Sequence, residues 1–187
     1  MVVVGDNATG KSFLRRIITL RCSKANPRIE PIRTSMEERS GAGYMYGPMR
    51  ALIYGDEGIF STGTNSLNVV RGGIKTSRGR EHPNILIFDE PDIGCSDSLA
   101  AGLGVQIRDF AADLPEYTRA VFVISHSRYL LQQLVGCDPH ILWMGENPGN
   151  SLQEWLTREV VPVDPEEVAE MNITTFRRIQ KILDRKK

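Results

Sequence analysis

The stretch Gly5-Asp6-Asn7-Ala8-Thr9-Gly10-Lys11-Ser12 follows an apolar run, Val2–Val4, and matches the pattern G-x-x-x-x-G-K-S/T. In this pattern the glycines let backbone N–H groups face a phosphate, the lysine reaches the β and γ oxygens, and the hydroxyl holds magnesium. A helix over Lys11–Arg21 would add the positive end of its dipole. The alternative is an ordinary strand-to-helix turn. We predict a nucleoside triphosphate site formed by Gly5, Asp6, Asn7, Ala8, Thr9, Gly10, Lys11, Ser12 and Phe13.

The composition is that of a globular protein with one domain. The chain has 187 residues, of which 41% are hydrophobic and 25% are charged, so residues 1–187 can form one adequate core. Its net charge of zero gives no general attraction to nucleic acids or membranes. No run of eighteen apolar residues occurs, and Met1 leads directly into the first apolar run, so we expect a soluble cytoplasmic protein. The three cysteines lack C-x-x-C spacing, which predicts reduced thiols.

Short apolar runs alternate with longer segments of helical period, a pattern that predicts an α/β fold with a mainly parallel central sheet. The stretch from Asn26 to Arg80 is rich in Gly, Ser, Arg and Asn, and we expect it to form an irregular or helical lid. The predicted strands are Val2–Val4, Ile85–Phe88, Ala120–Ile124 and Ile141–Met144, and the predicted covering helices are Leu99–Leu114 and Tyr129–Val135. Since ligands bind beyond the carboxyl ends of parallel strands, the polar residues after the first three strands should converge on one site.

The second of these strands ends in the acidic sequence Asp89-Glu90-Pro91. A carboxylate at the end of a buried strand needs a compensating cation, and magnesium on a triphosphate would supply one, so we expect Asp89 opposite Ser12. Glu90 should point the other way and serve as the general base or water-orienting group in γ-phosphoryl transfer. The alternative is a solvated strand exit with a turn proline.

The loop and the acidic strand together resemble the ATP-binding cassette (ABC) superfamily, over about Met1 to Trp143. The closer likeness is to soluble SMC, RecF and OLD-type ATPases, including small ones of phages and mobile elements. The resemblance implies a three-layer P-loop NTPase fold, ATP and Mg²⁺ as ligands, and hydrolysis coupled to dimerisation of two heads. It also implies DNA-related work, with DNA or a DNA-processing protein as an expected partner.

Three further segments bear on this resemblance. Phe60-Ser61-Thr62-Gly63-Thr64 resembles the family's signature loop, which implies that Ser61 and Gly63 bind the γ-phosphate held by the opposite subunit, at the start of a helix over Ser66–Val70. His126 follows an apolar strand and matches the family's switch histidine, which contacts the γ-phosphate. Asp97 resembles an aspartate that crosses the dimer interface. The alternatives are a flexible loop and a surface histidine.

The chain also departs from the family pattern. An aromatic residue that stacks on adenine is absent from the four residues before Gly5, so we expect adenine to be recognised elsewhere. No glutamine precedes Gln106 to link magnesium to the lid, and the carboxylates that could replace one are Glu37, Glu38, Asp56 and Glu57. The stretch between Lys11 and Phe60 is too short for a long coiled-coil arm. The sequence therefore predicts a minimal ATPase head.

The last part of the chain predicts a helix over about 164–187. Asp164 and Pro165 form a strong helix start, followed by two glutamates near the positive end of the dipole. We expect the buried stripe to comprise Phe176, Ile179, Ile182 and Leu183. The basic end of the helix could contact nucleic acid phosphates, but cations at a helix C-terminus are expected for dipole reasons alone.

Two other functions fit the phosphate loop. A small-molecule or polynucleotide kinase would need an acceptor site and an arginine-rich lid, which Arg71, Arg78 and Arg80 could form. The pair Asp89-Glu90 with His126 argues against a kinase, because transfer to an acceptor needs no water-activating glutamate. A regulatory module of low turnover, whose output is dimerisation or partner contact, is the other alternative.

Overall fold

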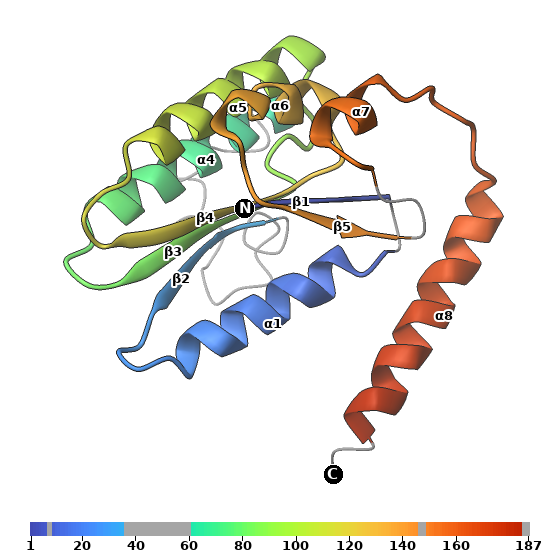
Figure 1. Ribbon diagram of the computed structural model, residues 1–187, viewed down its shortest axis with the longest axis horizontal. Coiled ribbons are helices and arrows are strands. Elements are labelled where there is room, and N and C mark those ends of the chain that lie inside the picture. The colour runs from blue at the N-terminus through green and yellow to red at the C-terminus, as the bar shows by residue number, and fades with distance from the viewer. Residues whose placement is uncertain (7–8, 36–60, 146–148, 185–187) are drawn as a thin grey trace.

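The computed structural model describes residues 1–6, 9–35, 61–145 and 149–184, apart from the side chains of residues 172 and 178–184. Within these residues the protein is α/β, with one sheet of five parallel strands between layers of helices (Figure 1). The strands are β1 (Val2–Gly5), β2 (Glu30–Thr34), β3 (Asn84–Asp89), β4 (Thr118–Ile124) and β5 (Ile141–Met144). Their order across the sheet is β2-β3-β4-β1-β5, which confirms the predicted α/β class and parallel sheet.

The helices lie on two faces according to the direction in which the chain crosses the sheet. From β1 the chain moves to β2 at the far edge, and α1 (Lys11–Ser23) covers one face on the way (Figure 1). It then moves back through β3, β4 and β5, and places α4 (Thr62–Arg78), α5 (Asp97–Ala112) and α6 (Arg128–Gln132) on the other face. Crossover connections between parallel strands are right-handed, so helices that connect strands in opposite directions along the sheet lie on opposite faces of it. The reversal occurs beside β1, where open α/β sheets bind ligands beyond the strand ends.

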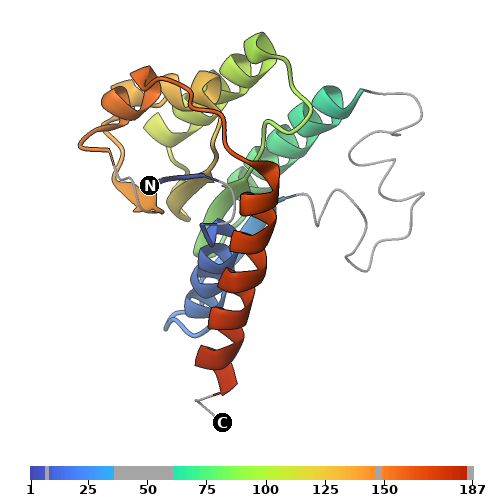
Figure 2. The same cartoon turned by 90° about the vertical axis from the view of Figure 1, so that its right-hand side faces the viewer.

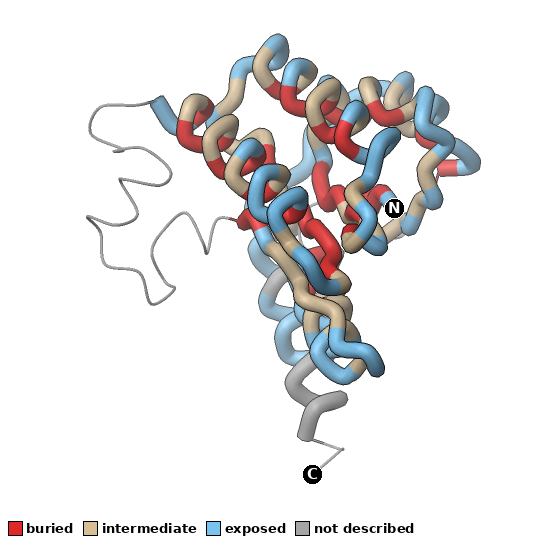
Figure 3. The backbone as a smooth tube through the Cα atoms, turned by 90° about the vertical axis from the view of Figure 1, so that its left-hand side faces the viewer, coloured by how far each residue is buried: buried red, intermediate tan, exposed pale blue. Residues whose placement is uncertain are grey.

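Two apolar layers flank the sheet. Leu86 and Phe88 of β3 pack with Leu103 and Ile107 of α5 on one face, and all four are fully buried. On the other face, Val3 and its neighbours in β3 and β4 pack with residues of α1. Figure 3 shows the buried positions along the strands and the inward sides of the helices. Because β3 is buried on both faces, its sequence is a continuous apolar run, which explains why the sequence predicts it well.

The structure differs from the predicted lid in two places. Residues 30–34 form the edge strand β2, in which Pro31 is tolerated because β2 pairs only with β3. The helix expected at Ser66–Val70 instead spans Thr62–Arg78. Its buried face includes Ser66, Gly73 and Ser77, so small and polar residues hide its helical period. Glu37, Glu38, Asp56, Glu57 and Phe60 lie outside the described residues.

The chain ends with α7 (Leu152–Thr157) and α8 (Pro165–Asp184). The helix start at Asp164 is confirmed, since the Glu166 amide donates a hydrogen bond of 2.9 Å to Asp164 Oδ1. Figures 1 and 2 show α8 extending away from the sheet. Phe176 is 62% exposed, so its predicted burial is wrong. The side chains of Ile179, Ile182 and Leu183 lie outside the described ones.

Among the described residues, no helix has both the length and the apolar character needed to cross a membrane.

Candidate functional site

The predicted phosphate loop joins β1 to α1 and rests on the end of β5. A Cβ atom at Gly5 would lie 2.3 Å from the carbonyl oxygen of Met144, so only glycine allows β1 and β5 to approach this closely. Gly10 has φ 91°, a left-handed conformation that favours glycine, and α1 starts at the next residue. A Cβ at Gly10 would lie 3.7 Å from the Met144 methyl group. Asn7 and Ala8 lie outside the described residues.

Lys11 lies across its own loop. Its Nζ donates hydrogen bonds of 2.9 Å to the Gly5 carbonyl and 2.7 Å to the Asp6 carbonyl, and the residue is 7% exposed. Burial lowers the pKa of Lys11, while the nearby charges of Glu90, Asp6 and Asp89 act in the opposite direction. The structure therefore brings the lysine of the loop and the acidic residues at the end of β3 into one electrostatic environment.

The N-terminus of α1 carries no side-chain cap. The amides of Phe13 and Leu14 donate hydrogen bonds to the Gly10 carbonyl. Lys11 and Ser12, the first two residues of the helix, come before these hydrogen bonds. Ser12 is exposed, Phe13 is half-buried, and Thr9 is fixed by a 2.8 Å hydrogen bond from its hydroxyl to the Asp6 carbonyl. A helix start of this kind attracts anions through its dipole and amides.

Asp89, at the end of β3, is bound to α1. Its Oδ2 lies 3.2 Å from Arg15 Nε, and the two side chains are 13% and 4% exposed. Arg15 also donates a 2.8 Å hydrogen bond from Nη1 to the buried hydroxyl of Ser35, directly after β2. Sequence reasoning expected Asp89 opposite Ser12 and missed this arginine. Its spacing places Arg15 on the same face of α1 as Lys11, one helical turn further on, but spacing alone does not show which residues this face contacts.

Glu90 and His126 form a second pair, at the ends of β3 and β4. Glu90 Oε1 lies 3.4 Å from His126 Nδ1, and the side chains are 33% and 48% exposed. Hydrogen bonding with His126 lowers the pKa of Glu90, against an opposing effect of burial. Hydrogen bonding with Glu90 likewise raises the pKa of His126, although burial opposes the shift. The pair therefore favours an ionised carboxylate and a protonated imidazole.

The backbone of Glu90 and the hydrogen bonds of Ser125, next to His126, fix the positions of the two residues of this pair. Glu90 has φ 49°, a conformation that is rare for residues other than glycine, and its amide donates a 2.8 Å hydrogen bond to the Ile124 carbonyl. Next to His126, the buried Ser125 hydroxyl donates a 3.0 Å hydrogen bond to Asp92 Oδ1 and accepts one from the Ser127 amide. Asp92 and Ser125 are thus positioning residues that sequence reasoning did not assign.

The predicted signature residues lie at the N-terminus of α4. The exposed Ser61 is the N-cap, and its hydroxyl accepts a hydrogen bond of 3.3 Å from the Thr64 amide. Gly63 is buried, and a Cβ there would lie 2.8 Å from the Gly94 carbonyl, so this glycine allows α4 to pack on residues 94–95. Asp97 is exposed in the first turn of α5, whose cap is Ser96. This end of α4 is therefore joined to the loop that follows Glu90.

The donor set is compatible with magnesium that arrives on a triphosphate. Among the described residues, no group of three or more His, Cys, Asp and Glu side chains could hold a metal ion. Mg²⁺ is bound in proteins by one or two carboxylates together with water and substrate phosphates. Asp89 supplies one carboxylate, and Ser12 supplies an exposed hydroxyl at the start of α1.

Comparison with protein-family models, with curated proteins and with solved structures finds no match. The chemistry of the site must therefore be judged from its residues. They provide a buried ammonium, an uncapped helix start, one carboxylate compensated by arginine and another paired with histidine, all at the carboxyl edge of one sheet.

Proposed function

We propose that this protein is a soluble P-loop ATPase of the ABC-like class, in which ATP bound with Mg²⁺ holds two heads together and its hydrolysis releases them. The observation that carries the proposal is the grouping of Lys11 with the Glu90–His126 pair. The loop motif supports nucleotide binding, and a glutamate held 3.4 Å from a histidine outside the loop supports water activation.

Each residue has a distinct role in this proposal. Lys11 exchanges its bonds to the loop carbonyls for the β and γ oxygens of the nucleotide, and the amides of residues 9–12 surround the phosphates. Ser12 and Asp89 hold magnesium, which neutralises charge on the phosphates. Glu90 orients and deprotonates the attacking water, while protonated His126 donates toward the γ-phosphate. The carboxylate that this role requires lies 3.4 Å from His126 Nδ1, on a residue whose backbone φ is 49°.

The proposal is tested by two substitutions in the intact chain. Lys11→Ala should abolish nucleotide binding measured by calorimetry, because it removes the one buried ammonium identified in the described part of the loop. Glu90→Gln should retain ATP and magnesium but lose hydrolysis. The matched controls are Lys24→Ala and Glu116→Gln, both at exposed positions outside the site. Normal turnover by Glu90→Gln would contradict the assigned role of Glu90.

Head association and DNA-related work are tested separately. With ATP and magnesium, Glu90→Gln should gain an association that its nucleotide-free form lacks, in which Ser61 and Gly63 of one head contact the nucleotide of the other. A variant that binds ATP and keeps the mass of its nucleotide-free form at high concentration would rule out this sandwich. ATPase rates with and without double-stranded DNA test the partner, since DNA-related work predicts stimulated hydrolysis. Phosphate transfer to a nucleotide or DNA end would instead identify a kinase.

A further inference from the structure

A basic groove lies between α4 and α5, away from the phosphate loop. It encloses about 510 Å³, and its floor contains the buried Phe110 and the half-buried Ile74. Arg71, Lys75 and Arg78 line it from α4 at helical spacing. The guanidinium of Arg78 lies 5.8 Å from the centre of the Phe110 ring. The groove thus combines an apolar floor with a row of cations.

Among the described residues that line the groove, one carboxylate opposes these cations. Asp109 of α5 is the acidic lining residue, and its Oδ1 is bonded to Arg108 Nη2 at 2.8 Å. Three cations against one compensated carboxylate leave the groove positive. Such a groove suits an occupant with acidic side chains beside an apolar anchor, which is the chemistry of an amphipathic helix.

The C-terminal helix α8 has this chemistry on one of its faces. Ile173 and Phe176 are 51% and 62% exposed, and Glu166 and Glu170 are exposed on the adjoining turns of the same side. Helical rise places Glu166 and Phe176 about 15 Å apart along the axis, enough to span the row from Arg71 to Arg78, which is about 10 Å long. The exposed Arg177, one turn after Ile173, lies on the same side. We call this side, formed by Glu166, Glu170, Ile173, Phe176 and Arg177, the acidic face of α8, because its two glutamates outnumber its arginine.

The segment that leads into α8 is also exposed. Val160, Val161 and Val163 are 73%, 74% and 71% exposed in the extended stretch between α7 and α8. Exposed apolar residues gathered on one terminal segment indicate a protein interface. The described residues thus present two surfaces of complementary chemistry, a mainly basic groove with an apolar floor and a mainly acidic helix face with exposed apolar residues.

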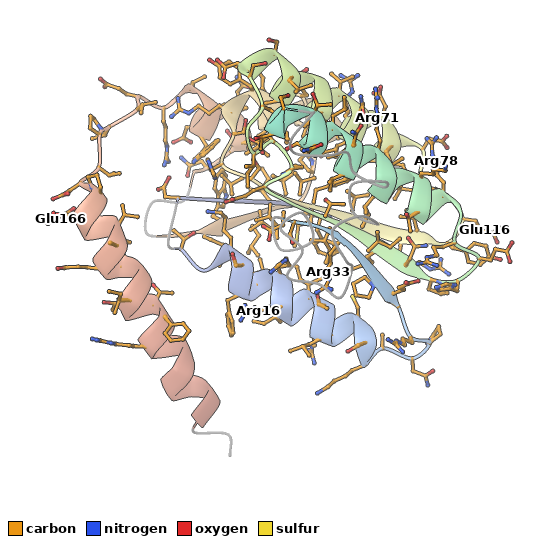
Figure 4. The ribbon with its side chains drawn as sticks, turned by 180° about the vertical axis from the view of Figure 1, so that it is seen from behind. Arg16, Arg33, Arg71, Arg78, Glu116 and Glu166 are labelled. Atoms are coloured by element: carbon orange, nitrogen blue, oxygen red, sulfur yellow. The ribbon has the colours of Figure 1, made fainter. Side chains whose placement is uncertain are left out.

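The two surfaces of one molecule lie far apart. Figure 4 shows Arg71 and Arg78 on α4 at one side of the sheet and Glu166 on α8 at the other. Figure 1 likewise shows α8 and α4 at opposite sides of the molecule, with β1 and β5 between them. A chain in this conformation does not fill its own groove, whereas a second copy can present α8 to it.

We propose that the acidic face of α8 docks into the basic groove of a second copy of this chain, and that the second copy reciprocates. Glu166 and Glu170 pair with cations of the α4 row, while Ile173 and Phe176 pack on the half-buried Ile74 in the floor of the groove. Two copies exchanging the same helix give a closed two-fold dimer. This association needs no nucleotide, and it differs in location from the proposed sandwich at Ser61 and Gly63.

A charge exchange in the full-length protein tests the proposal. The wild type should sediment as a dimer without nucleotide. The double variants Arg71→Glu/Arg78→Glu and Glu166→Lys/Glu170→Lys should each raise the dimer dissociation constant roughly tenfold or more, since each places like charges together. An equimolar mixture of the two variants should restore the dimer, because both contacts of the mixed pair are again complementary. Arg119→Glu and Glu116→Lys, exposed elsewhere, are the controls.

The outcomes separate this proposal from the alternatives. Circular dichroism shows that each variant is folded before its mass is measured. A monomeric wild type at its highest soluble concentration would overturn the proposal, as would a mixture of folded variants that fails to associate. If the wild type is monomeric and only Arg71→Glu/Arg78→Glu loses binding to a DNA duplex, the groove belongs to nucleic acid instead. Loss of ATPase activity decides none of these outcomes, because the dimer is measured without nucleotide.

Discussion

Asp89 and Glu90 are consecutive in the chain, yet they belong to two different regions of the same sheet edge. Asp89 is bonded to Arg15 in a nearly dry region beneath α1, with side chains 13% and 4% exposed. Glu90 faces His126 at the end of β4, in a region where the side chains are 33% and 48% exposed. We refer to these as the inner pair and the outer pair.

The difference shows how one acidic motif can serve two purposes. Charges in the inner pair are compensated inside the protein, so separating them exposes a buried charge and is costly. Charges in the outer pair remain in contact with water, so the pair contributes little to folding and is free to exchange partners. We therefore expect loss of Arg15 to act mainly on stability and loss of Glu90 to act mainly on chemistry.

The largest effect on stability is expected from breaking the inner pair. Arg15→Met should lower the free energy of unfolding by about 3–5 kcal/mol, because it leaves the Asp89 carboxylate buried without its cation. Urea denaturation followed by circular dichroism measures this change. Arg16→Met, at an exposed position on the same helix, should change stability by about 0.5 kcal/mol or less. Equal effects of the two substitutions would mean that the inner pair is not structural.

The matching substitution in the outer pair should separate activity from stability. Glu90→Gln should reduce ATP turnover by about 10²- to 10⁴-fold, the usual contribution of a general base, while unfolding changes by less than about 1 kcal/mol. Turnover is measured by phosphate release, and stability by the same urea titration as for Arg15→Met. A large stability loss without a loss of turnover would reverse the roles of the two pairs.

The outer pair should also give a pH dependence of stability. The pKa of His126 is raised above 6.5, so its contribution is complete below pH 6.5 and is lost as pH rises through the folded value. The pKa of Glu90 is lowered below 4.5, so its contribution is complete above pH 4.5 and is lost as pH falls. Lys11 and Asp92 act on His126 in opposite directions, which leaves Glu90 as its main partner.

The stability difference between the wild type and His126→Gln should therefore be greatest between pH 4.5 and 6.5 and smaller on either side. Thermal unfolding at a series of pH values measures it, with His140→Gln as the control. A difference that is constant across this range would show that the two side chains do not titrate as a pair.

The smallest effect concerns the backbone at the two positions. Glu90→Gly should be about 1–2 kcal/mol more stable than Glu90→Ala, because φ 49° strains alanine and does not strain glycine. At Asp89, inside β3, the order should reverse, with glycine about 0.5–1 kcal/mol less stable than alanine. The same order at both positions, measured by urea titration, would mean that no strain is stored at Glu90.

The sequence predicts the buried centre of the fold better than its edge. Strands β1, β3, β4 and β5 are apolar runs, and the polar residues that follow the first, third and fourth strands do meet at one edge, as predicted. The edge strand β2 has Ile32 as its single large apolar residue, so the sequence contains no apolar run that would predict this strand. Gly73 of helix α4 faces Thr34 and Leu86, where a Cβ atom would lie 2.7 Å from Thr34 Cγ2. A small residue therefore occupies a buried position of the helix, which weakens the apolar pattern that would predict it.

The candidate site shows a similar division. The phosphate-loop motif predicts Lys11 as a site residue, and position at or just after a strand end predicts Asp89, Glu90 and His126. These predictions need only the local sequence around each residue. Arg15 could not be identified in this way, since a helical arginine is usually solvated and its burial depends on Ser35 and Asp89, which arrive from distant strands. The pairing of Asp92 with Ser125 likewise joins residues separated by an entire helix and strand.

The contact between β5 and the phosphate loop offers an intrinsic spectroscopic reporter. The Met144 methyl group lies against Gly10, at the base of the loop, where a Cβ would be only 3.7 Å away. Methionine methyl groups give sharp, well-resolved signals in carbon-13 NMR of proteins of this size. The resonance of Met144 should therefore shift when a nucleotide fills the loop, so that occupancy can be followed without attaching a dye or changing any residue.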